Sequence, residues 1–141
     1  GNVSNIRVQP AFQRNRDVLL FLRDHASSIL IPGPFSSDFW DKSYLELSFP
    51  GKLAEYTQLG LPVIIHSPPS TVLSDWAKAR CWLAREESFS DSKLLRLFQR
   101  LTHQNVWKAM AAQSIEVSNA EFSAATIHTQ FERELVHLEA D

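Results

Sequence analysis

Residues 48–69 read SFPGKLAEYTQLGLPVIIHSPP, and the succession of residue types in this stretch decides the fold that we expect. Pro50 suits the first turn of a helix predicted over residues 50–59, and Gly60 suits its C-terminal stop. Residues 61–65 are apolar and β-branched, which predicts a central strand. The stretch therefore predicts a sharp loop, a helix and a buried strand in succession.

Similar segments lie on both sides of this stretch. The predicted elements are a strand over 6–8, a helix over 15–25, a strand over 28–31, a helix that Ser70 or Ser74 caps and that runs to about Arg80, and a short strand over 81–84. Strands that alternate with helices imply right-handed βαβ units and a parallel sheet. We therefore predict an α/β fold with a parallel sheet and flanking helices.

The C-terminal part of the chain is predicted to be helical. Asp91 or Ser92 is expected to cap one helix, a second helix covers about residues 104–120, and Ser123 begins a third. These helices would follow the predicted sheet within one α/β domain.

That domain divides into a β/α core, residues 1–85, and a helical C-terminal part, residues 86–141. Only three or four strands are predicted in the core, whereas a full doubly wound domain has five or six. Two interpretations stay open: a small complete α/β domain, and the second half of a larger one. Because Gly1 has no Met before it, we favour the second half of a larger domain whose first strands are absent from this chain.

Composition limits the classes of function. The chain has 141 residues, of which 44% are hydrophobic, so one domain can bury a core. Its formal net charge of -2 argues against a nucleic-acid partner or a membrane surface. No apolar run approaches the roughly 18 residues of a membrane span. The single cysteine, Cys81, excludes an internal disulfide and favours a reducing, cytoplasmic compartment.

The turn from loop to helix in the central stretch has the composition of an anion site. Gly51 lets a ligand approach the backbone closely, and the first turn of a helix offers unpaired N–H groups and a positive dipole end. Ser48 adds a hydroxyl and Lys52 a mobile positive charge, which together suit a diphosphate. Glu55 lies one turn further on, where a carboxylate can accept two hydrogen bonds from a vicinal diol such as a ribose. The alternative is that a Pro-Gly pair simply begins a surface helix with solvated Lys52 and Glu55.

Residues 49–69 closely resemble the donor-site signature of GT-B glycosyltransferases, in particular those of glycosyl transferases group 1 (family 4). Many members have a Ser-Phe-Pro-Ser-Lys-like start, a Lys-Leu-x-Glu-Tyr helix, and then Gly-x-Pro-Val and a strand. The resemblance extends more weakly over the whole chain. It implies a Rossmann-like C-terminal domain, partial in this chain and followed by C-terminal helices, that binds a nucleotide-sugar donor.

The resemblance also implies roles for single residues. Glu55 would bind the ribose of the donor, and Gly60 and Pro62 would form the turn from helix to strand. The residues that would bind the donor are Ser48, Phe49, Pro50, Gly51, Lys52, Glu55 and His66. The full-length protein would be a hexosyltransferase-like enzyme whose acceptor lies on an N-terminal domain absent from this chain, so the isolated chain would be inactive.

One position departs from the family's pattern. Retaining members often have two glutamates eight positions apart, the first of them near the donor sugar. Eight positions before Glu55 stands Leu47, and the adjacent Glu46 would point the other way in an extended backbone. The catalytic residue and the stereochemical outcome therefore stay unassigned.

Other residue types add little chemistry. The five histidines show no metal-ligand spacing with nearby carboxylates, so we expect no metal site, and the nucleotide sugar would be a substrate and not a cofactor. The four tryptophans are expected to pack in the core or against another domain. Two other functions stay open: a non-catalytic interaction module that kept the fold, and a fragment of a sugar-nucleotide epimerase.

Overall fold

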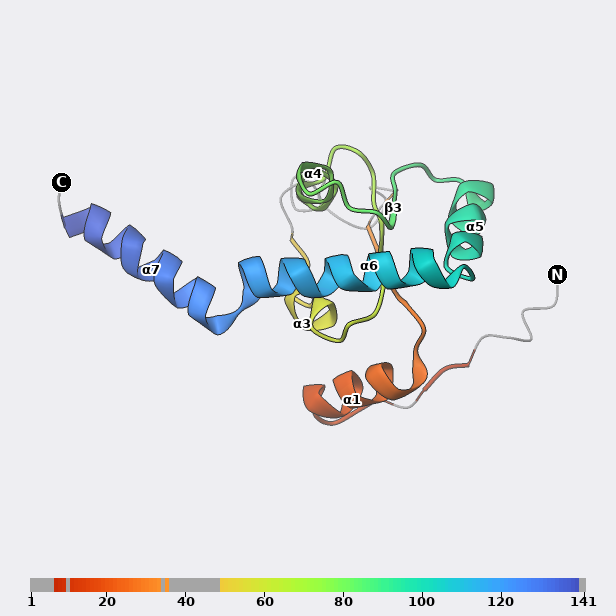
Figure 1. Ribbon diagram of the computed structural model, residues 1–141, viewed down its shortest axis with the longest axis horizontal. Helices are drawn as coiled ribbons and strands as arrows, with labels where there is room; N and C mark the ends of the chain where they lie inside the picture. Colours follow the sequence, from red (N-terminus) through yellow and green to blue (C-terminus); the bar gives the residue numbers. More distant parts are fainter. Residues whose placement is uncertain (1–6, 10, 34, 36–48, 140–141) are drawn as a thin grey trace.

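The computed structural model describes residues 7–9, 11–33, 35 and 49–139 and shows a small parallel sheet with flanking helices (Figure 1). The strands are β1 (Ile29–Pro32), β2 (Val63–His66) and β3 (Arg85–Glu86), in that order across the sheet. The helical elements are α1 (Asn15–His25), α3 (Leu53–Thr57), α4 (Val72–Ala79), α5 (Asp91–Arg100), α6 (Gln104–Val117), the π-helical turn η1 (Ser118–Phe122) and α7 (Ala124–Glu139). The described residues therefore form a mixed α/β fold.

The central strand β2 is buried on both faces. Val63, Ile64 and Ile65 have no exposed surface, as expected for an apolar strand that helices cover on both sides. β1 pairs with β2 in parallel, with Ile29 opposite Val63, and β3 pairs in parallel with the end of β2. The apolar run of the sequence thus occupies the centre of the sheet.

Strand β1 lies at an edge of this sheet. The N–H groups of Ile29 and of Gly33, the residue after the strand, donate to carbonyl groups of the β2 segment. Because backbone groups alternate in direction along a strand, those of Leu30 and Pro32 face the outer edge. Proline is tolerated there because it has no N–H to offer to a further strand.

Helix α6 runs along the length of the molecule, with α4 on one side of it and α3 on the other in the view of Figure 1. It contacts both α3 and β2, while α4 contacts β2 and α5 contacts β3. Beyond η1, α7 extends away from the sheet, and α1 lies on the side opposite α4. The sheet is thus contacted by α4 and α6 at β2 and by α5 at β3, while α3 packs on α6.

One hydrophobic core joins the sheet to these helices. Trp82 is buried in it, and its indole N–H donates to the Val63 carbonyl at 2.8 Å, so its polar group is satisfied. The buried members of the core are Ile31, Leu53, Val63, Ile64, Ile65, Leu73, Ala77, Trp82, Ala84, Leu97, Met110 and Val117.

The segments that follow β1 and β2 approach each other closely at Gly33. A Cβ at this position would lie 2.2 Å from Ser67 Oγ and 2.8 Å from Ser67 Cα. Ser67 is held in place because its hydroxyl bonds to that of Thr71 at 2.7 Å and its carbonyl accepts from the Ser74 hydroxyl at 3.0 Å. Glycine is therefore required where the carboxyl ends of β1 and β2 pack together.

The turn η1 is held against α4 by Glu121. Its carboxylate accepts hydrogen bonds from the Arg80 guanidinium, at 2.7 Å to one terminal nitrogen, and from the Trp76 indole at 3.2 Å. Arg80 also lies 4.5 Å from the centre of the Trp76 ring. The Trp76 ring stacks on that of Phe122, so η1 contacts α4 through both polar and aromatic groups.

Most predicted helices are confirmed, with small changes at their ends. The helix predicted over 15–25 is α1. Ser123 begins α7 as predicted, because its hydroxyl accepts a hydrogen bond from the Thr126 N–H at 3.1 Å. The strands predicted over 28–31 and 61–65 occur one or two residues later in the chain, as β1 and β2.

The prediction of a strand over 6–8 is wrong for the two of its residues that the structure describes. Arg7 and Val8 belong to no strand, and Val8 is 91% exposed. Ile6 lies outside the described residues. Alternation of side chains favours a strand only where a neighbouring strand takes up its hydrogen bonds.

The prediction of a strand over 81–84 is also wrong. These residues form a turn in which Cys81 has a φ of 49°, and β3 begins only at Arg85. Trp82 and Ala84 are buried because the turn packs beneath α4, with the Trp82 N–H bonded to the Ala77 carbonyl.

Two helices are shorter than predicted. The helix predicted over 50–59 is limited to α3, with turns before and after it, because the chain reverses at Gly60, where φ is 69°. The helix predicted over 104–120 ends at Val117, where its hydrogen bonding changes to that of the π-helical turn η1.

Two helix caps differ from the prediction. Thr71 caps α4, because its hydroxyl accepts the Ser74 N–H at 3.2 Å, so neither Ser70 nor Ser74 is the cap. Ser90 precedes α5 and makes no side-chain capping bond, so Asp91 and Ser92 lie inside that helix.

Candidate functional site

The carboxyl ends of the three parallel strands lie at one edge of the sheet, where ligands bind in open α/β sheets. Three aromatic rings gather there: Phe35 follows β1, His66 ends β2 and Phe89 follows β3. The Phe35 ring centre lies 4.5 Å from that of His66 and 5.4 Å from that of Phe89. Because Phe89 is 82% exposed, this edge presents aromatic surface to solvent.

His66 lies at this edge as predicted, and its ring is half-buried. Its Nε2 lies 3.0 Å from the Ser88 carbonyl, so Nε2 carries the hydrogen that this bond needs. The bond joins the end of β2 to the segment after β3. His66 therefore has a structural role at the edge where a ligand would bind.

The segment before α3 places Phe49 on the surface against α4. The Phe49 ring meets the Trp76 ring edge-on, with 5.7 Å between centres. The Pro50 carbonyl accepts the Leu53 N–H at 3.0 Å. A Cβ at Gly51 would meet no atom within 4 Å, so the space in front of this backbone is open to a ligand.

Lys52 and Glu55 lie together one turn apart on α3. Lys52 Nζ lies 3.9 Å from Glu55 Oε2 and donates a hydrogen bond to the Asn15 amide oxygen, at the start of α1, at 2.9 Å. Glu55 Oε2 is buried and makes no hydrogen bond with the residues that the structure describes, although the side chain as a whole is 37% exposed. A ligand hydroxyl can donate the hydrogen bond that this carboxylate oxygen lacks.

The helix that was predicted to begin at an anion site is shorter than the sequence suggested. α3 has 5 residues, so its aligned peptide dipoles are few. The Leu53 N–H is already bound to Pro50, which leaves fewer free donors in the first turn. Lys52, and not the helix dipole, is thus the main positive group of this segment.

The structure separates the predicted donor-binding residues into two sets. Phe49 contacts α4, and Lys52 contacts the start of α1 and lies beside Glu55. His66 instead contacts the segments after β1 and β3. Ser48, Leu47 and Glu46 lie outside the described residues. Among those that are described, no bond links His66 to Lys52 or Glu55.

Sequence reasoning missed a charged pocket of about 410 Å³ beside His66. We call it the β3 pocket, and its lining residues are Pro69, Arg85, Glu86, Glu87, Ser88 and Lys93. The strand was placed at 81–84, so residues 85–88 were not recognised as the end of a strand. The signal that could have found them is the sequence Arg-Glu-Glu-Ser at the carboxyl end of a parallel strand.

The Glu86 carboxyl in this pocket has a pKa below its ordinary value. Burial by itself raises the pKa, but the Ser88 hydroxyl and N–H both donate to the carboxylate, and Lys93 adds a nearby positive charge. These effects outweigh burial. Glu86 is therefore ionised at neutral pH.

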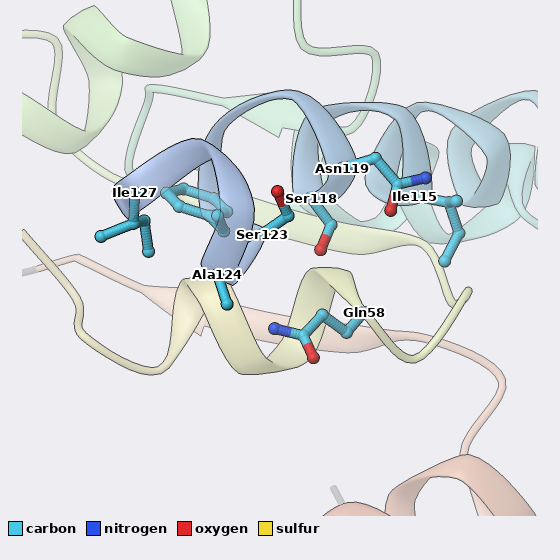
Figure 2. A pocket seen from close by; sticks show the side chains of 8 residues that line it. Gln58, Ile115, Ser118, Asn119, Ser123, Ala124 and Ile127 are labelled. Atoms are coloured by element: carbon cyan, nitrogen blue, oxygen red, sulfur yellow. The ribbon is translucent and has the colours of Figure 1, made fainter. Parts of the chain in front are cut away.

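A second hollow, a groove of about 530 Å³, lies between α3, the end of α6, η1 and the start of α7 (Figure 2). Gln58 enters it from α3, and Ile127 borders it on α7. Its lining residues are Gln58, Ile115, Ser118, Asn119, Phe122, Ser123, Ala124 and Ile127. None of these belongs to the predicted donor-binding residues.

The described part of the chain contains neither a cluster of metal ligands nor a helix that could cross a membrane. No three His, Cys, Asp or Glu side chains gather there in a way that could hold a metal ion. Each helix in the described ranges is too short or too polar to cross a membrane.

Comparison with protein-family models, with curated proteins and with solved structures finds no match for this chain. The mixed α/β fold with its parallel sheet, and the two groups of polar side chains described above, are therefore the basis for any functional conclusion.

Proposed function

We propose that the chain is the donor-binding part of a GT-B glycosyltransferase and binds the nucleotide diphosphate of a sugar donor. The observation that carries the proposal is the pairing of Lys52 and Glu55 at the start of α3, with one Glu55 oxygen lacking a hydrogen bond. The resemblance of residues 49–69 to the family's signature supports the same assignment. A Rossmann-like organisation of the complete domain is part of this proposal.

In this function, Lys52 neutralises the diphosphate and Glu55 holds a ribose. The Lys52 ammonium stabilises the charge that develops on the leaving diphosphate when the sugar is transferred. The Glu55 carboxylate accepts hydrogen bonds from a vicinal diol and so fixes the nucleoside. The open space before Gly51 admits the phosphate to the backbone. The acceptor and any catalytic base belong to the N-terminal domain of the full-length protein.

The test is a titration with a panel of nucleoside diphosphate sugars, followed by ligand-observed NMR. We expect weak binding by the chain and tighter binding by the full-length protein. Glu55→Ala and Lys52→Ala should each weaken binding by about tenfold or more, because a hydrogen bond to a charged group contributes about 1.5–3 kcal/mol.

Matched controls exist on α6. Lys108→Ala and Glu116→Ala remove the same charges from exposed positions and should leave binding unchanged. Equal binding by Glu55→Ala would remove the ribose role. Absence of binding by the full-length protein to every donor in the panel would refute the proposal.

A non-catalytic interaction module is the second candidate, and one observation favours it. Helix α7 exposes two large apolar side chains one turn apart, Ile127 at 52% and Phe131 at 62%. Exposed apolar groups of this kind mark surfaces that contact other proteins. If the chain is an interaction module, the full-length protein binds no nucleotide-sugar donor. Phe131→Ala then weakens its association with the protein or domain that α7 contacts.

A further inference from the structure

We propose that the β3 pocket binds a neutral saccharide ring. This site is separate from the Lys52–Glu55 pair of the proposed function and shares no residue with it. The pocket lies at the carboxyl ends of β2 and β3, and its volume of about 410 Å³ is within the range of small-ligand sites.

The charges on the pocket walls suit a neutral ligand with hydroxyl groups. Arg85 and Lys93 supply donors, and Glu86 and Glu87 supply acceptors. The two positive and two negative charges cancel, so neither an anion nor a cation gains a net attraction. A sugar hydroxyl both donates and accepts, and therefore matches walls that carry both donors and acceptors.

Two of these groups lack the hydrogen bonds that they can make. Glu87 Oε1 is buried and makes no hydrogen bond with the described residues, and its ionic neighbours are Lys78 Nζ at 3.4 Å and Arg85 Nε at 3.6 Å. The Glu87 side chain as a whole is 25% exposed and lines the pocket. Lys93 Nζ makes no hydrogen bond or ion pair with any residue that the structure describes. One acceptor and one donor are thus available to a ligand.

An exposed aromatic residue follows the lining residues in the chain. Phe89 comes directly after Ser88 and is 82% exposed, and its ring centre lies 5.4 Å from that of Phe35. The apolar C–H face of a sugar ring packs on such a ring while its hydroxyls reach the pocket. The combination of an exposed aromatic side chain next to the lining residues and walls with both donors and acceptors favours a saccharide over an acyclic polyol.

The pocket is also held in shape before any ligand binds. Lys78 Nζ donates to the Pro69 carbonyl at 3.1 Å, which ties the segment after β2 to α4. His66 bonds to the Ser88 carbonyl, and Ser88 in turn bonds to the Glu86 carboxylate at 2.8 Å through its N–H. Because these bonds already hold the pocket residues in place, ligand binding costs less conformational entropy.

The experiment is a titration of the isotope-labelled chain with the methyl glycosides of glucose, galactose and mannose, followed by amide NMR. We expect shifts confined to residues 85–93, with a dissociation constant in the millimolar range for at least one glycoside. Phe89→Ala should weaken binding by about two- to tenfold, and Lys93→Met should weaken it as well. Phe131→Ala and Lys108→Met, at exposed positions on α7 and α6, are the matched controls and should bind as the unaltered chain does.

Several results would overturn the proposal. These are the absence of shifts with all three glycosides, unchanged binding by Phe89→Ala, or larger shifts at residues 85–93 with inorganic phosphate than with any glycoside. A titration with a nucleoside diphosphate that carries no sugar distinguishes this site from the donor site. It should shift residues 49–55 only, so the failure of either proposal is recognised independently of the other.

Discussion

Gly33 and Gly51 show how differently two glycines of one chain are constrained. A side chain at Gly33 would collide with the backbone of Ser67, whereas one at Gly51 would meet open space. Only the first glycine is therefore required by packing. At the second, the absence of a side chain matters to a ligand and not to the fold.

We predict that Gly33→Ala destabilises the protein by about 1–3 kcal/mol, because the Ser67 backbone must move to accept the added methyl group. Gly51→Ala should be neutral or stabilising by about 0.4–1 kcal/mol, since alanine restricts the unfolded chain. Urea unfolding measures both changes. Equal stability of the two variants would show that the segments after β1 and β2 do not pack as described.

The low pKa of Glu86 gives a second prediction at the scale of single residues. Ser88→Ala removes the hydroxyl donor but keeps the N–H donor, so the Glu86 pKa should rise part of the way back to its ordinary value. NMR titration of the Glu86 carboxyl measures the change. Ser92→Ala, on the exposed start of α5, is the control and should leave this pKa unchanged.

The sign of the effect on stability follows from the direction of the shift. The pKa of Glu86 is lower in the folded than in the unfolded chain, so the stabilisation is present above the unfolded pKa. It is lost as the pH falls through the folded pKa. Ser88→Ala should therefore reduce stability near neutral pH and have little effect in strong acid, and the reverse pH dependence would contradict this account.

At the scale of elements, Glu121 connects the turn η1 to α4. Its carboxylate accepts bonds from Arg80 and Trp76, and Trp76 in turn packs on Phe49 before α3. The C-terminal helices are thus linked to the segment that carries Lys52 and Glu55. The Glu121 carboxylate thus ties the turn between α6 and α7 to α4.

We predict that Glu121→Gln lowers the free energy of unfolding by about 1–2 kcal/mol. The Glu121 and Arg80 side chains are 29% and 28% exposed, so water replaces part of the lost interaction. Glu132→Gln removes an exposed pair with His128 on α7 and should change stability little. Denaturant unfolding followed by tryptophan fluorescence checks both, and equal effects would argue against the role of Glu121.

The helices were predictable because their residues repeat locally, as the apolar residues of α1 do. The residues that cap the helices could not be predicted in the same way. Ser70, Thr71 and Ser74 all carry hydroxyl groups that can cap a helix, and only the path of the chain after β2 selects Thr71. The end of α6 at Val117 could not be predicted either, because Arg80 and Trp76, which hold η1 in place through Glu121, are distant in the sequence.

At the scale of the whole molecule, the described chain leaves several surfaces without a partner among the described residues. The outer edge of β1 exposes Leu30 at 40%, no residue of α1 is buried, and α7 exposes Ile127 and Phe131. Helices α1 and α7 project from different sides of the molecule in Figure 1.

The sequence by itself determined that β2 is a central parallel strand, that helices flank it, and that Lys52 and Glu55 lie one turn apart. Each of these depends on residues that are close together along the chain. Only the tertiary structure decided that Gly33 contacts Ser67, that His66 bonds to Ser88, and that the β3 pocket forms. Those contacts join segments that follow different strands, and the packing of the whole sheet sets the distance between such segments.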